Sequence, residues 1–322
     1  MPRITPPHLD AAPVLSILGP LPQPMNGACV TGNSNSEPGE PLRADQMADA
    51  ATRPTHAVAQ SQRLSGGPEG PNPTRDLAEE TPVAITCNGS TQAVMMATPA
   101  DLTDFAYGFA LTEGFVTCLD EIETHELVVH ETGIEARLWL SDDRAAALGA
   151  RRRAMAGPVG CGLCGIDSLQ QALRDLPIVA GDDVRFDPAE LRATTDLLRQ
   201  HQPLHDRTGA VHAAGFALPG QGIVLAREDV GRHNALDKLI GALARADQPA
   251  SAGALILTSR LSVELIQKCA IAGCGLIVAV SAPTRTALQL AQEAGITLVA
   301  NVRKGGGGVY THPHRVRSLP DR

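Results

Sequence analysis

Short unbroken apolar segments alternate with amphipathic segments through the last third of the chain. The apolar segments predict strands at 211–218, 223–226, 254–258, 276–280 and 296–302. Apolar positions at helical spacing predict helices at 234–244, 263–272 and 284–294. Strands without polar positions, alternating with helices, are typical of a mostly parallel sheet that is buried on both faces. The predicted fold class is therefore α/β, with helices on both faces of that sheet.

The pattern before this region is different and predicts a smaller α+β domain. Alternating segments at 83–86 and 93–96 flank Asn88-Gly89, and a second pair at 125–130 and 134–140 flanks Thr132-Gly133. Both pairs predict hairpins. Helices are predicted from Thr98, as N-cap, to about 113, over 142–155, and from Asp187 to about 200.

The first 75 residues show no lasting periodicity and hold more than half of the 24 prolines. Such a segment buries too little apolar area to offset its ordering entropy, so we expect disorder. The predicted organisation is a disordered extension over 1–75, an α+β domain over 76–160, a cysteine loop with a helical connection over 161–205, and an α/β domain over 206–322.

The amino-acid composition excludes several classes of protein for this chain. The 322 residues carry a net charge of −8, which disfavours a general binder of nucleic acid, and aromatic residues make up only 2%. No segment approaches the roughly 18 apolar residues of a membrane span, and the N-terminus lacks a secretory pattern. We expect a cytoplasmic protein without a membrane partner, whose cysteines stay reduced.

Cys161 and Cys164 are the foremost candidates for chemistry. They lie in the segment Gly160-Cys161-Gly162-Leu163-Cys164-Gly165, where glycines leave the sulfur atoms accessible. A short predicted helix follows, and the basic residues 151–153 precede it, so both favour the thiolate that attacks a persulfide.

Three other interpretations of the pair remain open from the residues alone. A zinc site would need Cys269 and Cys274 as further ligands, although these fall on and just after a predicted helix. A thioredoxin-like redox pair and a purely structural loop are the other two. A zinc nucleobase deaminase is excluded, since no His-x-Glu is present at His212 and Gly160, not proline, precedes Cys161.

Further polar segments follow the predicted strands. The ends of three strands carry Ser259-Arg260, the segment 281–284 and the segment 301–304, which together indicate an anion site at one edge of the sheet. A glycine-rich loop, 305–308, continues the last of them. The charged segment 227–238 is either a solvated turn or a set of side chains that orient a polar ligand, and His212 is ambiguous between core and site.

Together these segments resemble the formate dehydrogenase accessory sulfurtransferase family. The matching stretches, in chain order, are 79–83, 97–102, 108–114, 160–165, 208–214, 227–238 and 259–264.

The resemblance implies a sulfur carrier. Such proteins accept persulfide sulfur from a cysteine desulfurase and transfer it to the molybdenum bis-molybdopterin guanine dinucleotide cofactor that formate dehydrogenase requires. It assigns the persulfide to Cys161, with Cys164 assisting, and cofactor binding to a stretch formed by Asn301, Val302, Arg303, Lys304, Gly305 and Gly306. An aromatic residue usually opens that stretch, and Asn301 stands there instead.

The resemblance also implies a homodimer, a larger domain with a cytidine-deaminase-like fold, and an affinity for guanine nucleotides that mimic the cofactor. The alternative function is a zinc-stabilised nucleotide-binding or regulatory module, and a dithiol redox protein is a third hypothesis.

Overall fold

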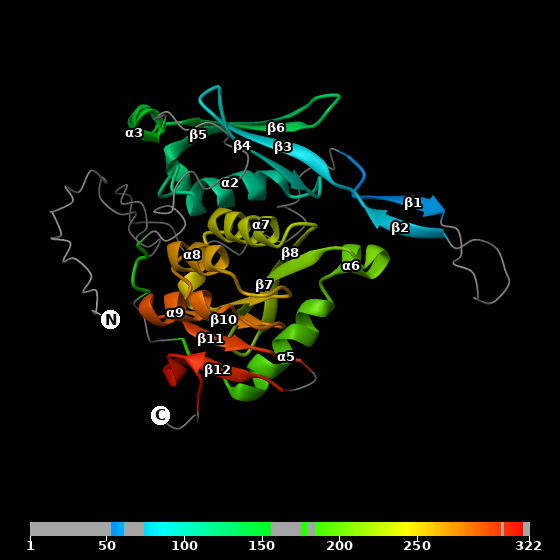
Figure 1. The fold of residues 1–322 in the computed structure, drawn as a ribbon, viewed down its shortest axis with the longest axis vertical. Helices are drawn as coiled ribbons and strands as arrows, with labels where there is room; N and C mark the ends of the chain where they lie inside the picture. The colour runs from blue at the N-terminus through cyan, green and yellow to red at the C-terminus, as the bar shows by residue number, and fades with distance from the viewer. Residues whose placement is uncertain (1–52, 61–73, 156–174, 180–183, 304–305, 318–322) are drawn as a thin grey trace, which may run out of the picture.

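The computed structural model describes residues 53–60, 74–155, 175–179, 184–303 and 306–317. Its elements form one large sheet, one smaller sheet and a two-stranded ribbon (Figure 1). No described helix has the length and apolar character needed to cross a membrane.

The large sheet contains six described strands in the order β12-β11-β10-β9-β7-β8. They are β7 (His212–Leu218), β8 (Gly222–Asp229), β9 (Ala254–Leu257), β10 (Leu276–Ala279), β11 (Thr297–Ala300) and β12 (Gly308–Thr311). Only β9, β10 and β11 pair in parallel, whereas β7 pairs antiparallel with β8 and β9, and β12 antiparallel with β11. The prediction of a mostly parallel sheet was therefore wrong. The turn between β7 and β8 is too short for the crossover that a parallel pair needs, so these strands form a hairpin.

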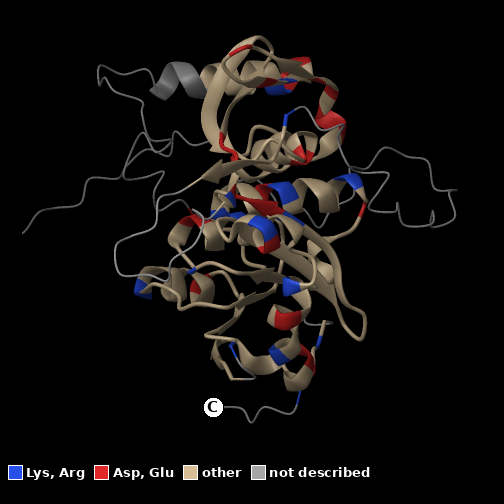
Figure 2. Ribbon diagram, turned by 90° about the vertical axis from the view of Figure 1, so that its right-hand side faces the viewer, with Lys and Arg blue, Asp and Glu red and all other residues tan. Residues whose placement is uncertain are grey.

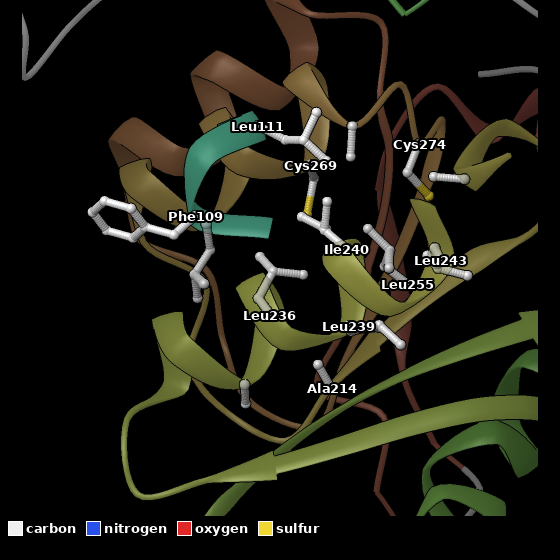
Figure 3. Close-up of a cluster of buried hydrophobic side chains, with 14 of the residues drawn as sticks. Phe109, Leu111, Ala214, Leu236, Leu239, Ile240, Leu243, Leu255, Cys269 and Cys274 are labelled. Carbon is white, nitrogen blue, oxygen red and sulfur yellow. The ribbon is translucent and has the colours of Figure 1, made fainter. Parts of the chain in front are cut away.

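Helices cover both faces of this sheet, as predicted. Side chains at alternate strand positions fall into two buried clusters, one on each face. The helices α7 (Arg232–Arg245), α8 (Val263–Ile271) and α9 (Arg285–Glu293) pack on one face, and α5 (Pro188–Arg199) packs on the other. Figure 3 shows the first cluster, where the sulfur atoms of Cys269 and Cys274 lie among aliphatic side chains.

The smaller sheet has the order β4-β3-β6-β5, built from the two predicted hairpins. Its strands are β3 (Thr81–Cys87), β4 (Ser90–Ala97), β5 (Ile122–Val129) and β6 (Ile134–Leu140), followed by helix α3 (Asp142–Met155). Helix α2 (Leu102–Thr112) lies between this sheet and α7, so it joins the two halves of the molecule (Figure 1).

Two glycines allow α2 and α7 to touch through their backbones. A Cβ atom added at Gly108 would lie 1.7 Å from the Asp237 carbonyl oxygen, and one at Gly241 would lie 1.9 Å from the Asp104 carbonyl oxygen. Only glycine permits this approach, because real Cβ contacts do not fall below about 3 Å.

The start of α2 differs from the prediction. Thr98 is not its N-cap; Asp101 takes that position with φ of 53°. The Thr98 hydroxyl instead accepts a hydrogen bond from the Val230 N–H at 3.1 Å, and the Thr98 N–H donates to Asp229 at 3.0 Å. Thr98 therefore makes tertiary hydrogen bonds to β8 and the residue after it and does not cap α2.

The predicted disordered extension contains one described strand. β1 (His56–Gln60) pairs antiparallel with β2 (Thr74–Ala78), and the ribbon projects from the body beside helix α6 (Pro203–Thr208) (Figure 1). Residues 53–60 are thus ordered, which corrects that part of the prediction. The remaining domain boundaries and the cytidine-deaminase-like topology stay predictions.

Candidate functional site

A pocket of about 630 Å³ opens at the carboxyl ends of the three parallel strands. Its floor is formed by residues at the ends of β9, β10 and β11, and its wall by α5, α6 and the loop that leads into β7. The lining residues are Thr195, Asp196, Arg199, Gln202, His205, Gly209, Ala210, Val211, His212, Thr258, Val280, Val302 and Arg303. The volume lies in the range of small-molecule sites, and the strand ends are where open α/β sheets bind ligands.

The strand side of the pocket includes part of the predicted cofactor stretch. Val302 is buried against the α5 face of the sheet, whereas Arg303 is exposed and its Nε donates to the Val280 carbonyl at 2.9 Å. Asn301 does not line the pocket; its backbone has φ of 58°, and its amide donates to the Tyr310 hydroxyl at 2.6 Å. Gly306 closes a turn by donating to the Arg303 carbonyl. Lys304 and Gly305 lie outside the described residues.

The helical side of the pocket is held by a carboxylate from β8. Glu228 accepts hydrogen bonds from the Leu204 N–H at 2.8 Å and the His205 N–H at 2.9 Å. These are the second and third residues of α6. Their N–H groups have no partner within the helix, and an N-cap side chain ordinarily accepts hydrogen bonds from them. Burial raises the pKa of Glu228, although these two backbone bonds oppose the change.

Two histidines, His205 and His212, line the pocket near the start of β7. The His205 Nδ1 lies 2.9 Å from the Val211 carbonyl, which can only accept, so that nitrogen carries the proton. The His212 Nδ1 lies 3.4 Å from the Thr258 hydroxyl. Burial lowers the pKa of His212, and the charges of Arg232 and His205 lower it further. His212 is therefore neutral at pH 7, and it lines the pocket as a half-buried residue.

The charges at the mouth of the pocket are mixed. Arg199 pairs with Asp206, and Arg303 supplies a second guanidinium group, while Asp196 is an exposed acid on the same rim. Two guanidinium groups at helix and strand ends suit an anionic ligand.

The comparisons with known proteins give the family of the chain. The model of the FdhD/NarQ family matches residues 78–317. The chain belongs to the FdhD/NarQ family. A sulfur carrier protein FdhD from Agrobacterium fabrum is 50% identical over 242 residues, covering 75% of this chain and 89% of that protein. One from Bordetella petrii is 46% identical over 277 residues, covering 84% and 98%.

A solved structure gives the same result. A protein from Desulfotalea psychrophila, described as a formate dehydrogenase accessory protein, superposes with a TM-score of 0.62 at 26% identity. The match covers 82% of this chain and all of that one. All the described pocket residues fall inside the FdhD/NarQ match.

The cysteine pair of this FdhD/NarQ family member, Cys161 and Cys164, lies outside the described residues. Cys269 and Cys274, the ligands that a zinc site would add, are buried in the core. Burial raises the pKa of Cys269 well above its usual value and that of Cys274 to about 11, so both remain thiols at neutral pH. Within the described ranges, no group of His, Cys, Asp and Glu side chains is arranged to hold a metal ion.

The charged segment 227–238 has a structural role that the sequence did not indicate. Lys238 and Asp229 are both fully buried and form an ion pair at 2.7 Å. Arg227 pairs with Asp104 of α2 at 2.7 Å, and Arg245 pairs with the other oxygen of that carboxylate at 2.6 Å. Figure 2 shows acidic and basic segments together where α2 meets α7. Arg227, Asp229 and Lys238 are buried in ion pairs, so this part of the segment is not a solvated turn.

The helical side of the pocket was not predicted from the sequence; its residues include Arg199, Gln202 and His205. One signal was present: polar residues continue from Arg199 to Gln202, past the end of the apolar pattern of α5, and Pro203 then starts a new element.

Proposed function

We propose that the chain is a sulfur carrier that supplies the molybdenum cofactor of formate dehydrogenase. The observation that carries the proposal is the convergence of two distant motifs in one pocket. Arg303, from the predicted cofactor stretch, and His212, from the segment 208–214, both line it. The names of the FdhD relatives, at 46–50% identity over most of both chains, support the same role.

The first step is the loading of Cys161. Its thiolate attacks the terminal sulfur of a cysteine desulfurase persulfide. A new bond forms between that sulfur and Cys161 Sγ, the desulfurase S–S bond breaks, and its cysteine leaves as a thiolate. No electrons are gained or lost overall, and Cys164 assists by holding or relaying the sulfur.

The second step brings the sulfur to the cofactor, which is cargo here. We propose that the pocket holds the guanine nucleotide part of the bis-molybdopterin guanine dinucleotide. Its phosphates lie at the mouth, where Arg303 and Arg199 supply positive charge. Neutral His212 and the Thr258 hydroxyl add hydrogen-bonding groups at the strand ends. A homodimer that also contacts formate dehydrogenase completes the proposal.

Intact-protein mass spectrometry tests the loading step. The wild type and the Cys161→Ala, Cys164→Ala and Cys118→Ala variants are each incubated with a cysteine desulfurase and cysteine. We expect a gain of about 32 Da per sulfur in the wild type, reversed by reductant and lost in Cys161→Ala.

Cys118 is the control because it is a partly exposed cysteine outside the motif. Its variant should load like the wild type. An unloaded wild type that retains one zinc ion under native conditions would refute sulfur transfer and favour a zinc-stabilised module. Loss of sulfur in Cys118→Ala, with loading kept in Cys161→Ala, would refute the assigned carrier.

A further inference from the structure

Gln202 has an unusual position at the start of α6. It is the N-cap residue, only 3% exposed, yet its side chain makes no capping hydrogen bond. The N–H groups that it would cap, those of Leu204 and His205, are bound by the Glu228 carboxylate. Glu228 therefore leaves the Gln202 amide without a role in the helix.

The Gln202 amide has no hydrogen-bond partner among the described residues, while its backbone carbonyl accepts from the Asp206 N–H. A glutamine amide carries two donors and an acceptor oxygen, and buried polar groups of folded proteins are nearly always paired. Gln202 lines the pocket at the carboxyl edge of the sheet. Its missing partner is therefore to be sought in the occupant of the pocket.

We propose that Gln202 determines the specificity of this pocket by hydrogen bonding to the base edge of a bound nucleoside diphosphate. The inference rests on the proposed function, since that function places a nucleotide there, and it assigns a residue to recognition of the base. Gln202 is a binding residue, and Glu228 is a positioning residue that acts through α6.

The chemistry of the amide favours a base over a phosphate. An amide presents a donor and an acceptor side by side, which matches a heterocycle edge that carries an N–H beside a C=O. Phosphate oxygens at neutral pH mainly accept hydrogen bonds, so they would leave the Gln202 carbonyl oxygen buried and unpaired. Arg199 and Arg303 are exposed residues of the pocket lining, where a bound diphosphate would also keep contact with water.

The variant Gln202→Met removes the amide and keeps the length of the side chain. Isothermal titration with GDP is carried out on the wild type, Gln202→Met and Gln200→Met, and inorganic pyrophosphate is titrated as a competitor that lacks a base. Gln200 is the matched control, because it is the same residue type two positions earlier, exposed and outside the pocket lining.

We expect Gln202→Met to weaken GDP binding about tenfold or more, as the loss of one or two hydrogen bonds predicts. Pyrophosphate affinity and the affinities of Gln200→Met should stay at wild-type values. The melting temperature of Gln202→Met without ligand should be unchanged or higher, because an unpaired buried amide is replaced by an apolar group.

Three results would overturn the assignment of Gln202. The first is GDP affinity within twofold of wild type. The second is a loss of pyrophosphate affinity equal to the loss of GDP affinity in Gln202→Met. The third is a lower melting temperature of that variant, which would show that the Gln202 amide stabilises the folded protein. If the wild type binds no GDP, both the role of Gln202 and the proposed nucleotide site in this pocket are refuted. The loading of sulfur on Cys161 is tested independently by the mass-spectrometry experiment.

Discussion

The backbone contact between α2 and α7 leads to a quantitative prediction about stability. The variant Gly108→Ala would place a Cβ atom 1.7 Å from the Asp237 carbonyl oxygen and 2.8 Å from the Gly241 nitrogen. The reciprocal variant Gly241→Ala would place one 1.9 Å from the Asp104 carbonyl oxygen. The obstacles are main-chain atoms of packed helices, so the helices must separate by more than an ångström.

The size of the effect follows from what that separation disturbs. Overpacking a core costs about 1–3 kcal/mol when side chains can adjust. Here the backbone must move, and the 2.6 Å ion pair between Asp104 of α2 and Arg245 of α7 crosses the same contact. We expect either variant to lose about 3 kcal/mol or more of unfolding free energy. The double variant should lose less than the sum, because one separation of the helices relieves both clashes.

Urea unfolding followed by circular dichroism measures these values. Gly308→Ala is the control, since the nearest atom to its added Cβ is 3.5 Å away, an ordinary contact. A loss below about 0.5 kcal/mol in Gly108→Ala, or strictly additive losses in the double variant, would refute the backbone contact.

Two further predictions concern buried charges. Lys238→Met leaves the Asp229 carboxylate buried without its cation, so urea unfolding should show a loss of about 3–5 kcal/mol. Adding Asp229→Asn should recover only part of it, because the Asp229 carboxylate also accepts hydrogen bonds from the Thr98 and Gly231 N–H groups. A loss below about 1 kcal/mol in Lys238→Met would contradict this. Burial, with Arg232 nearby, lowers the pKa of His233 to about 4, against the opposing charge of Glu264. Its contribution to stability is present above pH 6.5 and is lost as the pH falls toward 4, because the unfolded state then binds the proton first. Relative to wild type, His233→Gln should therefore be more stable at pH 5 than at pH 7 in urea unfolding, and an unchanged difference would contradict the assignment.

Much of the fold was predictable because its signals are local. Both hairpins, the helices on both sheet faces and the capping box at Asp187 are encoded within a few residues of each element. The antiparallel pairing of β12 with β11 was not predictable in this way, since β12 follows the loop after Arg303 and no local signal gives its direction. β1 was missed for a related reason: its partner β2 lies beyond a segment with no periodicity.

The candidate site was only partly predictable. The strand ends identified Val302 and Arg303 at the pocket, because parallel strands bring their carboxyl ends to one edge. The partners of Arg227 and Lys238 cannot be found from the sequence, because Asp104 and Thr98 come from α2 and the loop before it, more than a hundred residues earlier. Charge density in a sequence does not distinguish residues that bind a ligand from residues that bind each other.

A comparison of the N-termini of α5 and α6 explains why the sequence does not indicate a binding role for Gln202. At α5, Asp187 and Glu190 lie three residues apart and cap the helix reciprocally, so the sequence alone predicts that start. At α6, the capping carboxylate is Glu228, which arrives from the neighbouring strand β8. Only the structure shows that the Gln202 side chain does not cap α6, because the Leu204 and His205 N–H groups donate to Glu228 instead. Because a buried amide without a partner is unfavourable, the presence of Gln202 at the pocket wall points to a ligand that supplies the missing hydrogen bonds.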